Sequence, residues 1–454
     1  MSSSNISFDP SYAVAVDIGG TFTDISLLDR SSGTVWRAKT PSIPADPSQA
    51  FMTGVNMVLE DAGITAAELS RVLHGTTVAT NMILEGKGAR TALVTTQGFR
   101  HVLEIGRQDI PRHANLFTWV KPARPVPAER ILEVTERIGT GGKVMQELDE
   151  ESVIRVAKAL KRQNVEAIAV CLLHAYANPA HELRVQEIIR QAYPDLPISL
   201  SCDVCPEIRE YERQSTTCAN AYVQPRMAGY LRELDQSLKS QGFGCPFLLM
   251  TSGGGLTTLE NAMRYPIRLV ESGPAGGAIL AAEVAKELGL NSVVSYDMGG
   301  TTAKLCLIDD GAPLATRTFE VARAYRNMKG SGVPVRIPAI EMVEIGAGGG
   351  SIASIDSMGR LAVGPQSAGS DPGPACYDLG GAEPTVTDAD VMLGKIDPAL
   401  FAGGNVKLSP DKAGAVVEAK IGGAMGLSAP LAAYAVAEIV DENMANAARV
   451  HAIE

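Results

Sequence analysis

Residues 16–29 read VDIGGTFTDISLLD, and residues 296–309 read YDMGGTTAKLCLID. In both stretches an apolar run leads into a Gly-Gly-Thr turn, and a second apolar run follows it. This pattern is typical of two strands joined by a tight turn, so the sequence predicts the same hairpin in each half of the chain. Six of the fourteen aligned positions are identical: Asp17/Asp297, Gly19/Gly299, Gly20/Gly300, Thr21/Thr301, Leu27/Leu307 and Asp29/Asp309.

The residue types in the repeat suit a phosphate group. Adjacent glycines permit unusual backbone dihedral angles and leave no side chain in the way of an anion. Successive N–H groups in such a turn form an anion-binding concavity, and the threonine hydroxyls add donors. An aspartate at the end of the first strand can hold Mg²⁺ (or Mn²⁺), because this ion prefers a few carboxylates together with phosphate oxygens. A single copy could be an ordinary glycine hairpin, but two copies favour a pair of turns that grip a triphosphate, such as that of ATP, across a cleft.

The repeat therefore predicts individual roles. Asp17 and Asp297 are predicted to be catalytic and to bind the metal, although an aspartate here can also cap its own turn. Lys304 stands where the first copy has Asp24, and it is either a phosphate contact or the solvated end of a strand. The residues predicted to bind phosphate are Gly19, Gly20, Thr21, Thr23, Gly299, Gly300, Thr301, Thr302 and Lys304.

Composition and charge argue against several classes of partner. The net charge is −11 and no Lys/Arg-rich block occurs, so nucleic acid is not expected to bind. No apolar stretch approaches about 18 uninterrupted residues, so no membrane span is expected. The first ten residues are polar and lack an apolar signal core, which predicts a cytoplasmic protein. Seven scattered cysteines with one C-x-x-C, Cys202 to Cys205, are expected to be structural.

The rest of the chain alternates apolar strand-like runs with helical patterns. Residues 151–163 have the spacing of an amphipathic helix and residues 167–173 read as a buried strand, and this alternation predicts an α/β fold. Residues 328–384 are rich in Gly and Pro and are expected to form a loop-rich insertion. A boundary near Pro206 divides the chain into two predicted domains, residues 1–205 and 206–454, each carrying one hairpin.

Further candidate site residues lie outside the repeat. His74, Thr76, Thr77 and Asn81 follow a strand at a predicted helix start, and they are either near the substrate or part of a satisfied helix cap. Glu271 precedes a Ser-Gly-Pro turn and is expected to face the nucleotide.

Three acidic residues fall at the end of the loop-rich stretch or just after it. Asp388 and Asp390 share one face if the chain is extended there, so they could hold a metal or transfer protons. Asp371 lies nearby in sequence, and turn chemistry is the alternative for all three. The glycine loops at 252–255 and 346–350 follow strands and could pass close to the nucleotide.

The paired hairpins resemble the two phosphate motifs of the superfamily that contains actin, hexokinase and the heat-shock chaperones. The resemblance to one branch, the hydantoinase A/oxoprolinase family, runs from about Val14 to the last residue. Six ordered segments carry it: HGTTVATN (74–81), YERQSTT (211–217), ESGPAGG (271–277), IGAGGGS (345–351), SDPGPAC (370–376) and TVTDAD (385–390).

The resemblance implies duplicated ribonuclease-H-like (actin-like ATPase) domains that face a nucleotide cleft. It implies the ATP-binding subunit of a cyclic-amide hydrolase, which phosphorylates the carbonyl oxygen of a hydantoin, a lactam or 5-oxoproline. Asp17 would lie near the metal and Asp297 would position a nucleophile. A hydantoinase B-type partner subunit would complete a hetero-oligomer. The family's C-terminal glycine-rich adenosine motif is absent from this sequence, so the second domain is expected to be incomplete.

Two alternatives remain open from the residues alone. Subunits of acetone and acetophenone carboxylases are similar, and they use ATP to activate a ketone or bicarbonate. A nucleotide-switched binding protein, like the chaperone members of the superfamily, would hydrolyse ATP slowly and without response to a cyclic amide. The motifs do not identify the ring or ketone, the oligomeric state or the base for water attack.

Overall fold

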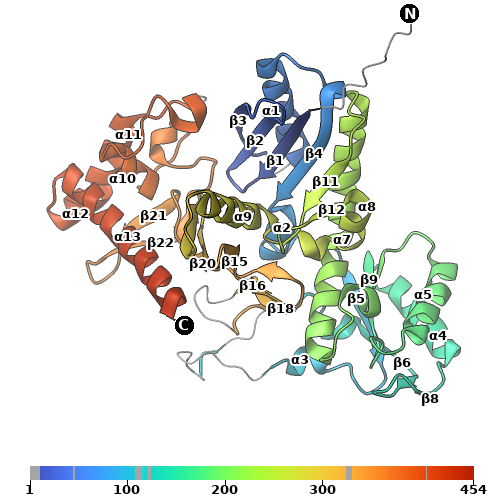
Figure 1. The fold of residues 1–454 in the computed structure, drawn as a ribbon. Coiled ribbons are helices and arrows are strands. Elements are labelled where there is room, and N and C mark those ends of the chain that lie inside the picture. The colour runs from blue at the N-terminus through green and yellow to red at the C-terminus, as the bar shows by residue number, and fades with distance from the viewer. Residues whose placement is uncertain are drawn as a thin grey trace, which may run out of the picture.

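The computed structural model describes residues 11–43, 46–107, 115, 117–119, 124–323, 330–404 and 406–453. The polar N-terminal stretch of residues 1–10 lies outside them. The described chain is α/β and contains three main sheets, which Figure 1 shows in separate parts of the molecule. The predicted α/β class is confirmed.

The first sheet contains the first hairpin. Its order is β12-β11-β4-β1-β2-β3, in which β1, β2 and β3 form an antiparallel meander, β4 runs parallel to β1, and β11 runs parallel to β4. The strands are β1 (Tyr12–Ile18), β2 (Phe22–Asp29), β3 (Val35–Pro41), β4 (Leu69–Thr76), β11 (Phe247–Met250) and β12 (Leu256–Thr258). Alternating burial along β2 shows the period of two expected when one face of a strand is buried.

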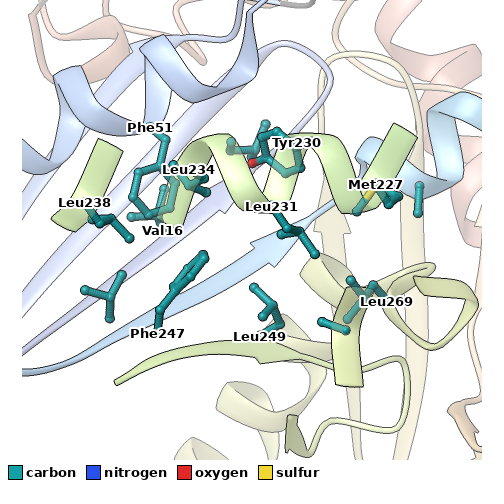
Figure 2. Close-up of a cluster of buried hydrophobic side chains, with 14 of the residues drawn as sticks. Val16, Phe51, Met227, Tyr230, Leu231, Leu234, Leu238, Phe247, Leu249 and Leu269 are labelled. Atoms are coloured by element: carbon teal, nitrogen blue, oxygen red, sulfur yellow. The ribbon is translucent and has the colours of Figure 1, made fainter. Parts of the chain in front are cut away.

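Two helices pack their apolar sides onto this sheet. Helix α1 (Pro47–Ala62) contributes Phe51 and Val55, and the long helix α7 (Glu210–Ser240) contributes Leu231 and Leu234. Figure 2 shows Phe51 and the α7 side chains meeting Phe247 and Leu249 in one continuous core. Burial of this apolar surface is the main force that holds the first hairpin in place.

The predicted boundary near Pro206 does not separate two packing units. Strands β11 and β12 and helix α7 come after it in sequence, yet they belong to the first sheet and its core. Strand pairing depends on the path of the chain in space, which the composition shift at residue 206 does not reveal.

A second sheet lies beside the first, at the lower right of Figure 1. Its order is β10-β9-β5-β6 and all its neighbours are parallel. The strands are β5 (Thr91–Thr96), β6 (Ile131–Val134), β9 (Ala167–Cys171) and β10 (Ile198–Leu200), with helices α4 (Glu150–Arg162) and α5 (Ala180–Ala192). Every residue of β9 is buried, as is usual for a parallel strand covered on both faces.

The third sheet contains the second hairpin, β13 (Val293–Met298) and β14 (Ala303–Asp309). Strand β15 (Ala312–Pro313) pairs antiparallel with β14, so β13-β14-β15 repeats the antiparallel order β1-β2-β3, and β20 (Val343–Ile345) pairs with the other end of β14. Within the described residues β13 has one partner strand, whereas β1 has β4 on its other side. Accordingly Val294, Tyr296 and Met298 of β13 are exposed.

Helices surround the second hairpin. Helix α9 (Ser272–Glu287) lies in the centre of Figure 1 and packs on β13, β14 and β4. Helices α10 (Val386–Met392), α11 (Pro410–Val417) and α13 (Ala429–Ile453) form a separate core with β14, β20 and β21 (Ser351–Ile355).

Where the structure describes it, the predicted loop-rich stretch contains strands, the longest of which is β22 (Leu361–Ser367), and the 3-10 helix Ala375–Tyr377. Among the described helices none is by itself long and apolar enough to cross a bilayer. The bent pair Pro410–Met425 and Ala429–Ile453 meets the length and composition criteria together.

Candidate phosphate-binding cleft

The two hairpins close with the same turn. The Gly19 N–H donates to the Phe22 carbonyl at 3.0 Å, and the Gly299 N–H donates to the Thr302 carbonyl at 2.9 Å. The φ angles of the four turn glycines are outside the left-handed region: Gly19, Gly20, Gly299 and Gly300. The unusual dihedral angles that the sequence predicted therefore do not explain why glycine occurs in these turns. At Gly19 close approach favours glycine, because a Cβ there would lie 3.0 Å from the Phe22 carbonyl oxygen, whereas a Cβ on Gly299 would lie at an ordinary contact distance of 3.5 Å from the Thr302 carbonyl oxygen.

The turns also meet each other. A Cβ on Gly300 would lie 2.6 Å from Thr21 Oγ1 and 3.3 Å from Thr21 Cβ. Thr21 and Gly300, which are 279 positions apart in sequence, therefore touch. A Cβ on Gly20, in contrast, would meet no atom within 4 Å, so open space lies beside the first turn.

Asp17 lies in a cradle of glycine backbone. Its partner in the parallel strand β4 is Gly75, and a Cβ there would lie 3.0 Å from Asp17 Oδ1. Gly273, at the start of α9, is closer still, since its Cβ would lie 2.7 Å from the same oxygen. Neither glycine was among the predicted site residues, although both stand inside the HGTT and ESGP segments.

The electrostatics of Asp17 favour a cation. Part of the residue reaches solvent, but the surrounding protein desolvates the carboxyl and raises its pKa to about 6, and the charges of Asp24 and Asp297 add to the rise. Asp24 has an ion-pair partner in Lys39 at 2.8 Å. Beyond the strand pairing of their backbones, the side chains of Asp17 and Asp297 make no hydrogen bond or ion pair to another described residue.

These residues fit Mg²⁺. The described ranges contain no cluster of three or more His, Cys, Asp or Glu residues that could hold a metal alone. Mg²⁺ does not need such a cluster, because it is commonly bound by one or two carboxylates plus phosphate oxygens. Asp17 and Asp297 supply carboxylates of this kind on either side of the meeting turns.

Lys304 is not a solvated strand end. Its ammonium group forms an ion pair with Glu271, and both side chains are largely buried. Burial opposes the charge of Lys304, but Glu271, Glu344 and Asp297 outweigh it and raise the lysine pKa. The ion pair places Glu271 next to the second hairpin, and its predicted contact with the nucleotide stays a prediction.

The segment 271–273 touches both hairpin sheets. Ser272 Oγ donates to the Thr76 carbonyl and accepts from the Thr76 N–H, each at 3.1 Å. Gly273 lies against Asp17, and Glu271 holds Lys304. The start of α9 therefore links β4 beside the first hairpin to β14 of the second.

The threonines that were predicted to bind phosphate lie in different environments. Thr23 is fully buried and its hydroxyl bonds Ser42 Oγ at 3.0 Å, while Ser42 Oγ donates to the Gly19 carbonyl at 2.8 Å. The phosphate contact predicted for Thr23 is wrong, because alternation along β2 points this side chain away from Asp17 and Asp24. Thr301 is exposed at the second turn and Thr21 stands between the turns, so both remain predicted phosphate contacts, together with Thr302.

His74 belongs to the core. It is 1% exposed, its Nδ1 bonds the Val16 carbonyl at 3.1 Å, and its Nε2 bonds the Tyr230 hydroxyl at 2.8 Å. Its ring packs against Phe51 and Phe247. A direct substrate contact by His74 is excluded, because the side chain supports β1 from behind Asp17.

The other residues of the HGTTVATN segment tie β4 and α2 (Val78–Leu84) to the end of β1. The Thr77 N–H and hydroxyl both donate to the Ile18 carbonyl at 3.0 Å, and Asn81 Nδ2 donates to Thr77 Oγ1 at 3.4 Å. Thr76 is buried and its Oγ1 accepts from the Val78 N–H at 3.1 Å. These contacts place the end of the first strand. Thr77 is the N-cap of α2 but makes no side-chain capping bond, because its hydroxyl donates to the Ile18 carbonyl instead.

His74 predicts a specific acid sensitivity of the fold. Burial lowers its pKa from 6.5 to about 4, so the native state disfavours a proton that the unfolded chain accepts. The unfolding free energy should therefore fall as pH drops below 6.5, by about 2 kcal/mol at pH 5 from this group. Urea unfolding of the wild type and His74→Gln from pH 7 to pH 5 measures this, and the variant should lack that component. Equal pH dependence in both proteins would contradict the assignment.

The glycine loop at 346–350 supports the second turn from behind. The Gly349 N–H donates to the Gly299 carbonyl at 3.0 Å, and the Gly350 N–H donates to the Gly300 carbonyl at 2.6 Å. A Cβ on Gly348 would lie 2.7 Å from the Gly299 carbonyl oxygen. The loop therefore contacts the predicted phosphate turn through its backbone.

Hydrogen bonds and packing contacts with nearby residues hold the loop at 252–255 in place. Ser252 is buried and its hydroxyl donates to the carbonyls of Arg268 and Val270. A Cβ on Gly254 would meet the side chain of Ile279 in α9. Its contacts are those of a structural turn.

The predicted carboxylate pair of Asp388 and Asp390 is wrong. Both residues lie in helix α10, where positions two apart do not share a face. Asp388 is fully buried and accepts from the Cys376 N–H at 2.7 Å and the Thr385 N–H at 2.9 Å, so it caps α10 and anchors the loop before it. Asp390 lies 3.5 Å from Lys395, and Asp371 is exposed.

A cavity of about 660 Å³ lies away from the two turns, beside the N-terminal end of α7. Its charged lining residues are already paired, with Arg107 on Glu212 at 2.6 Å and Arg124 on Glu104 at 3.4 Å. None of the predicted site residues lines it.

Comparison with known proteins identifies relatives along the whole chain. Residues 213–453 match the profile of the family described as hydantoinase/oxoprolinase, and residues 13–193 match that of the hydantoinase/oxoprolinase N-terminal region. The acetophenone carboxylase gamma subunit of Aromatoleum aromaticum is 37% identical, over 96% of this chain and 60% of its own length. The caprolactamase subunit alpha of Pseudomonas jessenii is 34% identical, over 98% of this chain and 63% of its own.

Solved structures agree with these matches. The nucleotide-free structure of acetone carboxylase superposes with a TM-score of 0.81 at 26% identity, and it covers 95% of this chain and 61% of that one. The crystal structure of the ATP-dependent caprolactamase from Pseudomonas jessenii gives a TM-score of 0.76 at 32% identity, with 96% and 62% covered. The chain thus spans a little over three-fifths of the length of these proteins.

Proposed function

Because the chain belongs to the hydantoinase/oxoprolinase family, we propose that it is the ATP-binding part of an enzyme subunit that phosphorylates the carbonyl oxygen of its substrate. The observation that carries this proposal is the meeting of the two Gly-Gly-Thr turns beside the unpaired carboxylates of Asp17 and Asp297. Two relatives are described as ATP-dependent, the caprolactamase and the acetone carboxylation system. Their structures share this fold.

We further propose that the two hairpins mark duplicated ribonuclease-H-like halves of an actin-like ATPase. The orders β1-β2-β3 and β13-β14-β15 support the duplication, since both are antiparallel and both begin with the strand that carries the aspartate. Each half presents its turn to the other, which gives a triphosphate two sets of donors.

Each residue has a proposed task. Backbone N–H groups of the two turns, with the hydroxyls of Thr21 and Thr301, would donate to phosphate oxygens. Lys304 would add a point charge. Bound Mg²⁺ would be held by Asp17 and would neutralise the charge that develops on the transferred phosphoryl group. Asp297 would orient the attacking oxygen.

The chemistry explains why ATP is needed. An amide is stabilised by resonance and its oxygen is a poor leaving group. When the carbonyl oxygen attacks the terminal phosphorus, the bond to the bridging oxygen breaks and ADP leaves. Water attacks the carbon of the resulting imidate phosphate, and the C–N bond breaks with the nitrogen taking up a proton, which leaves a ring-opened acyl phosphate. A second water then releases phosphate and the free acid. We propose that a hydantoinase B-type partner subunit carries out the hydrolytic step, since relatives are named as the alpha and gamma subunits of their enzymes.

A cyclic amide is the first proposed substrate class, because the name of one relative is caprolactamase. A ketone is the second, because the relative from Aromatoleum aromaticum is a carboxylase subunit at similar identity. All seven cysteines are free thiols, which is usual in a reducing compartment, so we propose that the protein works in the cytoplasm.

Phosphate release from ATP tests the proposal. The chain would be assayed alone and co-expressed with the B-type subunit, against hydantoins, lactams, 5-oxoproline, acetone and acetophenone with bicarbonate. Release that depends on a cyclic amide and yields the ring-opened acid supports the first substrate class. Release that depends on a ketone and fixes bicarbonate supports the second. ATP hydrolysis that no carbonyl compound changes would contradict the proposed function and indicate a nucleotide-switched binding protein.

A further inference from the structure

Lys304 and Glu271 form an ion pair inside the cleft. Lys304 lies on β14 directly opposite Asp297 of β13, and its side chain is 12% exposed. Its ammonium group contacts Glu271 Oε2. A phosphate that enters between the turns would have to compete with this carboxylate for the lysine.

At the position that corresponds to Lys304, the first hairpin carries an acidic residue. Asp24 stands opposite Asp17, and its partner Lys39 comes from β3 in the same sheet. In the second hairpin the cation stands next to the aspartate, and its partner Glu271 comes from outside the sheet. Lys304 is thus a cation placed beside Asp297 and neutralised by a group on another element.

The conformation of Glu271 is strained. Its φ of 63° and ψ of 23° are left-handed, which costs energy for a residue with a Cβ. Its N–H donates to Thr80 Oγ1 at 3.2 Å, and the next residue, Ser272, is bonded to Thr76. A strained conformation that surrounding bonds enforce is a recognised mark of functional positions.

We propose that Glu271 is a built-in counter-ion that occupies Lys304 while the cleft is empty and yields the lysine to a phosphate when ATP binds. The inference rests on the proposed function, because it requires a triphosphate in this cleft. Glu271 acts through Lys304, so it is a positioning residue. Its charge lowers the intrinsic affinity for nucleotide and keeps the lysine paired in a cleft that otherwise contains Asp17, Asp297 and Glu344.

If Glu271 and phosphate compete for Lys304, substitutions of Glu271 and of Lys304 should change the Kd for ATP in opposite directions. Glu271→Gln frees Lys304 for the phosphate, so the Kd for ATP should fall roughly tenfold. Lys304→Gln should raise it roughly tenfold. The double variant should resemble Lys304→Gln alone, because Glu271 then has no lysine to occupy. Calorimetric titration with ATP and with inorganic tripolyphosphate measures these changes.

Two controls separate competition from other effects. Glu287→Gln removes the same charge at the exposed far end of α9 and should leave both Kd values unchanged. Glu271→Asp keeps the charge with a shorter side chain and should stay near the wild type, which separates charge from a general change of shape.

The outcomes distinguish the two proposals. Weaker binding in Glu271→Gln would overturn the inference and assign the pair a purely structural role. Tighter tripolyphosphate binding in Glu271→Gln supports the inference even if no carbonyl compound stimulates phosphate release. Failure of the wild type to bind either ATP or tripolyphosphate would overturn both proposals.

Discussion

Asp17→Asn is expected to lower substrate-dependent phosphate release from ATP by about 10²–10³-fold. The substitution keeps the shape that fits between Gly75 and Gly273 but removes a charge that no other described residue pairs with. A neutral amide holds Mg²⁺ poorly, so the loss should persist at saturating ATP. Assays of release across a series of Mg²⁺ concentrations would measure the size of the effect and its metal dependence.

Asp24→Asn is the matched control for this experiment. Asp24 stands opposite Asp17 in the hairpin, and it is paired with Lys39 at the exposed side. The same change of charge there should alter release by no more than about threefold, the effect of a surface ion pair. Unchanged turnover in Asp17→Asn would remove its assigned metal role, and equal losses in both variants would point to general charge repulsion.

Gly348→Ala is expected to abolish measurable ATP binding. The added Cβ would lie 2.7 Å from the Gly299 carbonyl oxygen and 2.7 Å from the Thr301 carbonyl carbon, both of them backbone atoms of the second turn. Backbone cannot rotate aside as a side chain can, so the turn or the loop must shift and their contact must change. Overpacking of this kind also costs about 1–3 kcal/mol of stability. Calorimetric titration with ATP gives the first quantity, and urea unfolding gives the second.

Gly229→Ala is the control for replacing glycine by alanine at a position with room for the added methyl group. Gly229 lies within α7, and a Cβ there would meet no atom within 4 Å. This variant should bind ATP normally and should gain up to about 1 kcal/mol of stability, because alanine favours a helix. If Gly348→Ala binds ATP as well as Gly229→Ala does, the loop at 346–350 is not needed to place the second turn.

The sequence repeat predicted the two hairpins, but it did not predict which distant residues the hairpins contact. Asp17, Asp297 and the two turns follow from residues that stand next to each other in sequence. The neighbours of Asp17 depend on a parallel register between β1 and β4, which places Gly75 opposite it. No local pattern in the sequence specifies that register, so Gly75 and Gly273 escaped prediction.

The sequence predicted the roles of residues less well in the segments that carry the family resemblance than in the repeat. His74 and Asp388 are polar residues in glycine-rich or turn-like contexts, which made a chemical role attractive. Both proved to be buried and fully hydrogen-bonded, one beneath β1 and the other at the start of α10. A buried polar group must find partners or destabilise the fold, so burial alone accounts for such residues.

The amino-acid sequence by itself determined the two strand-turn-strand units, the aspartate in each, and the family to which the chain is related. These properties depend on neighbouring residues, whose order is the sequence. Only the tertiary structure decided that Gly300 meets Thr21, that Glu271 holds Lys304, and that the loop at 346–350 supports the second turn. Such contacts join distant parts of the chain, and packing of the helices and sheets against one another brings those parts together.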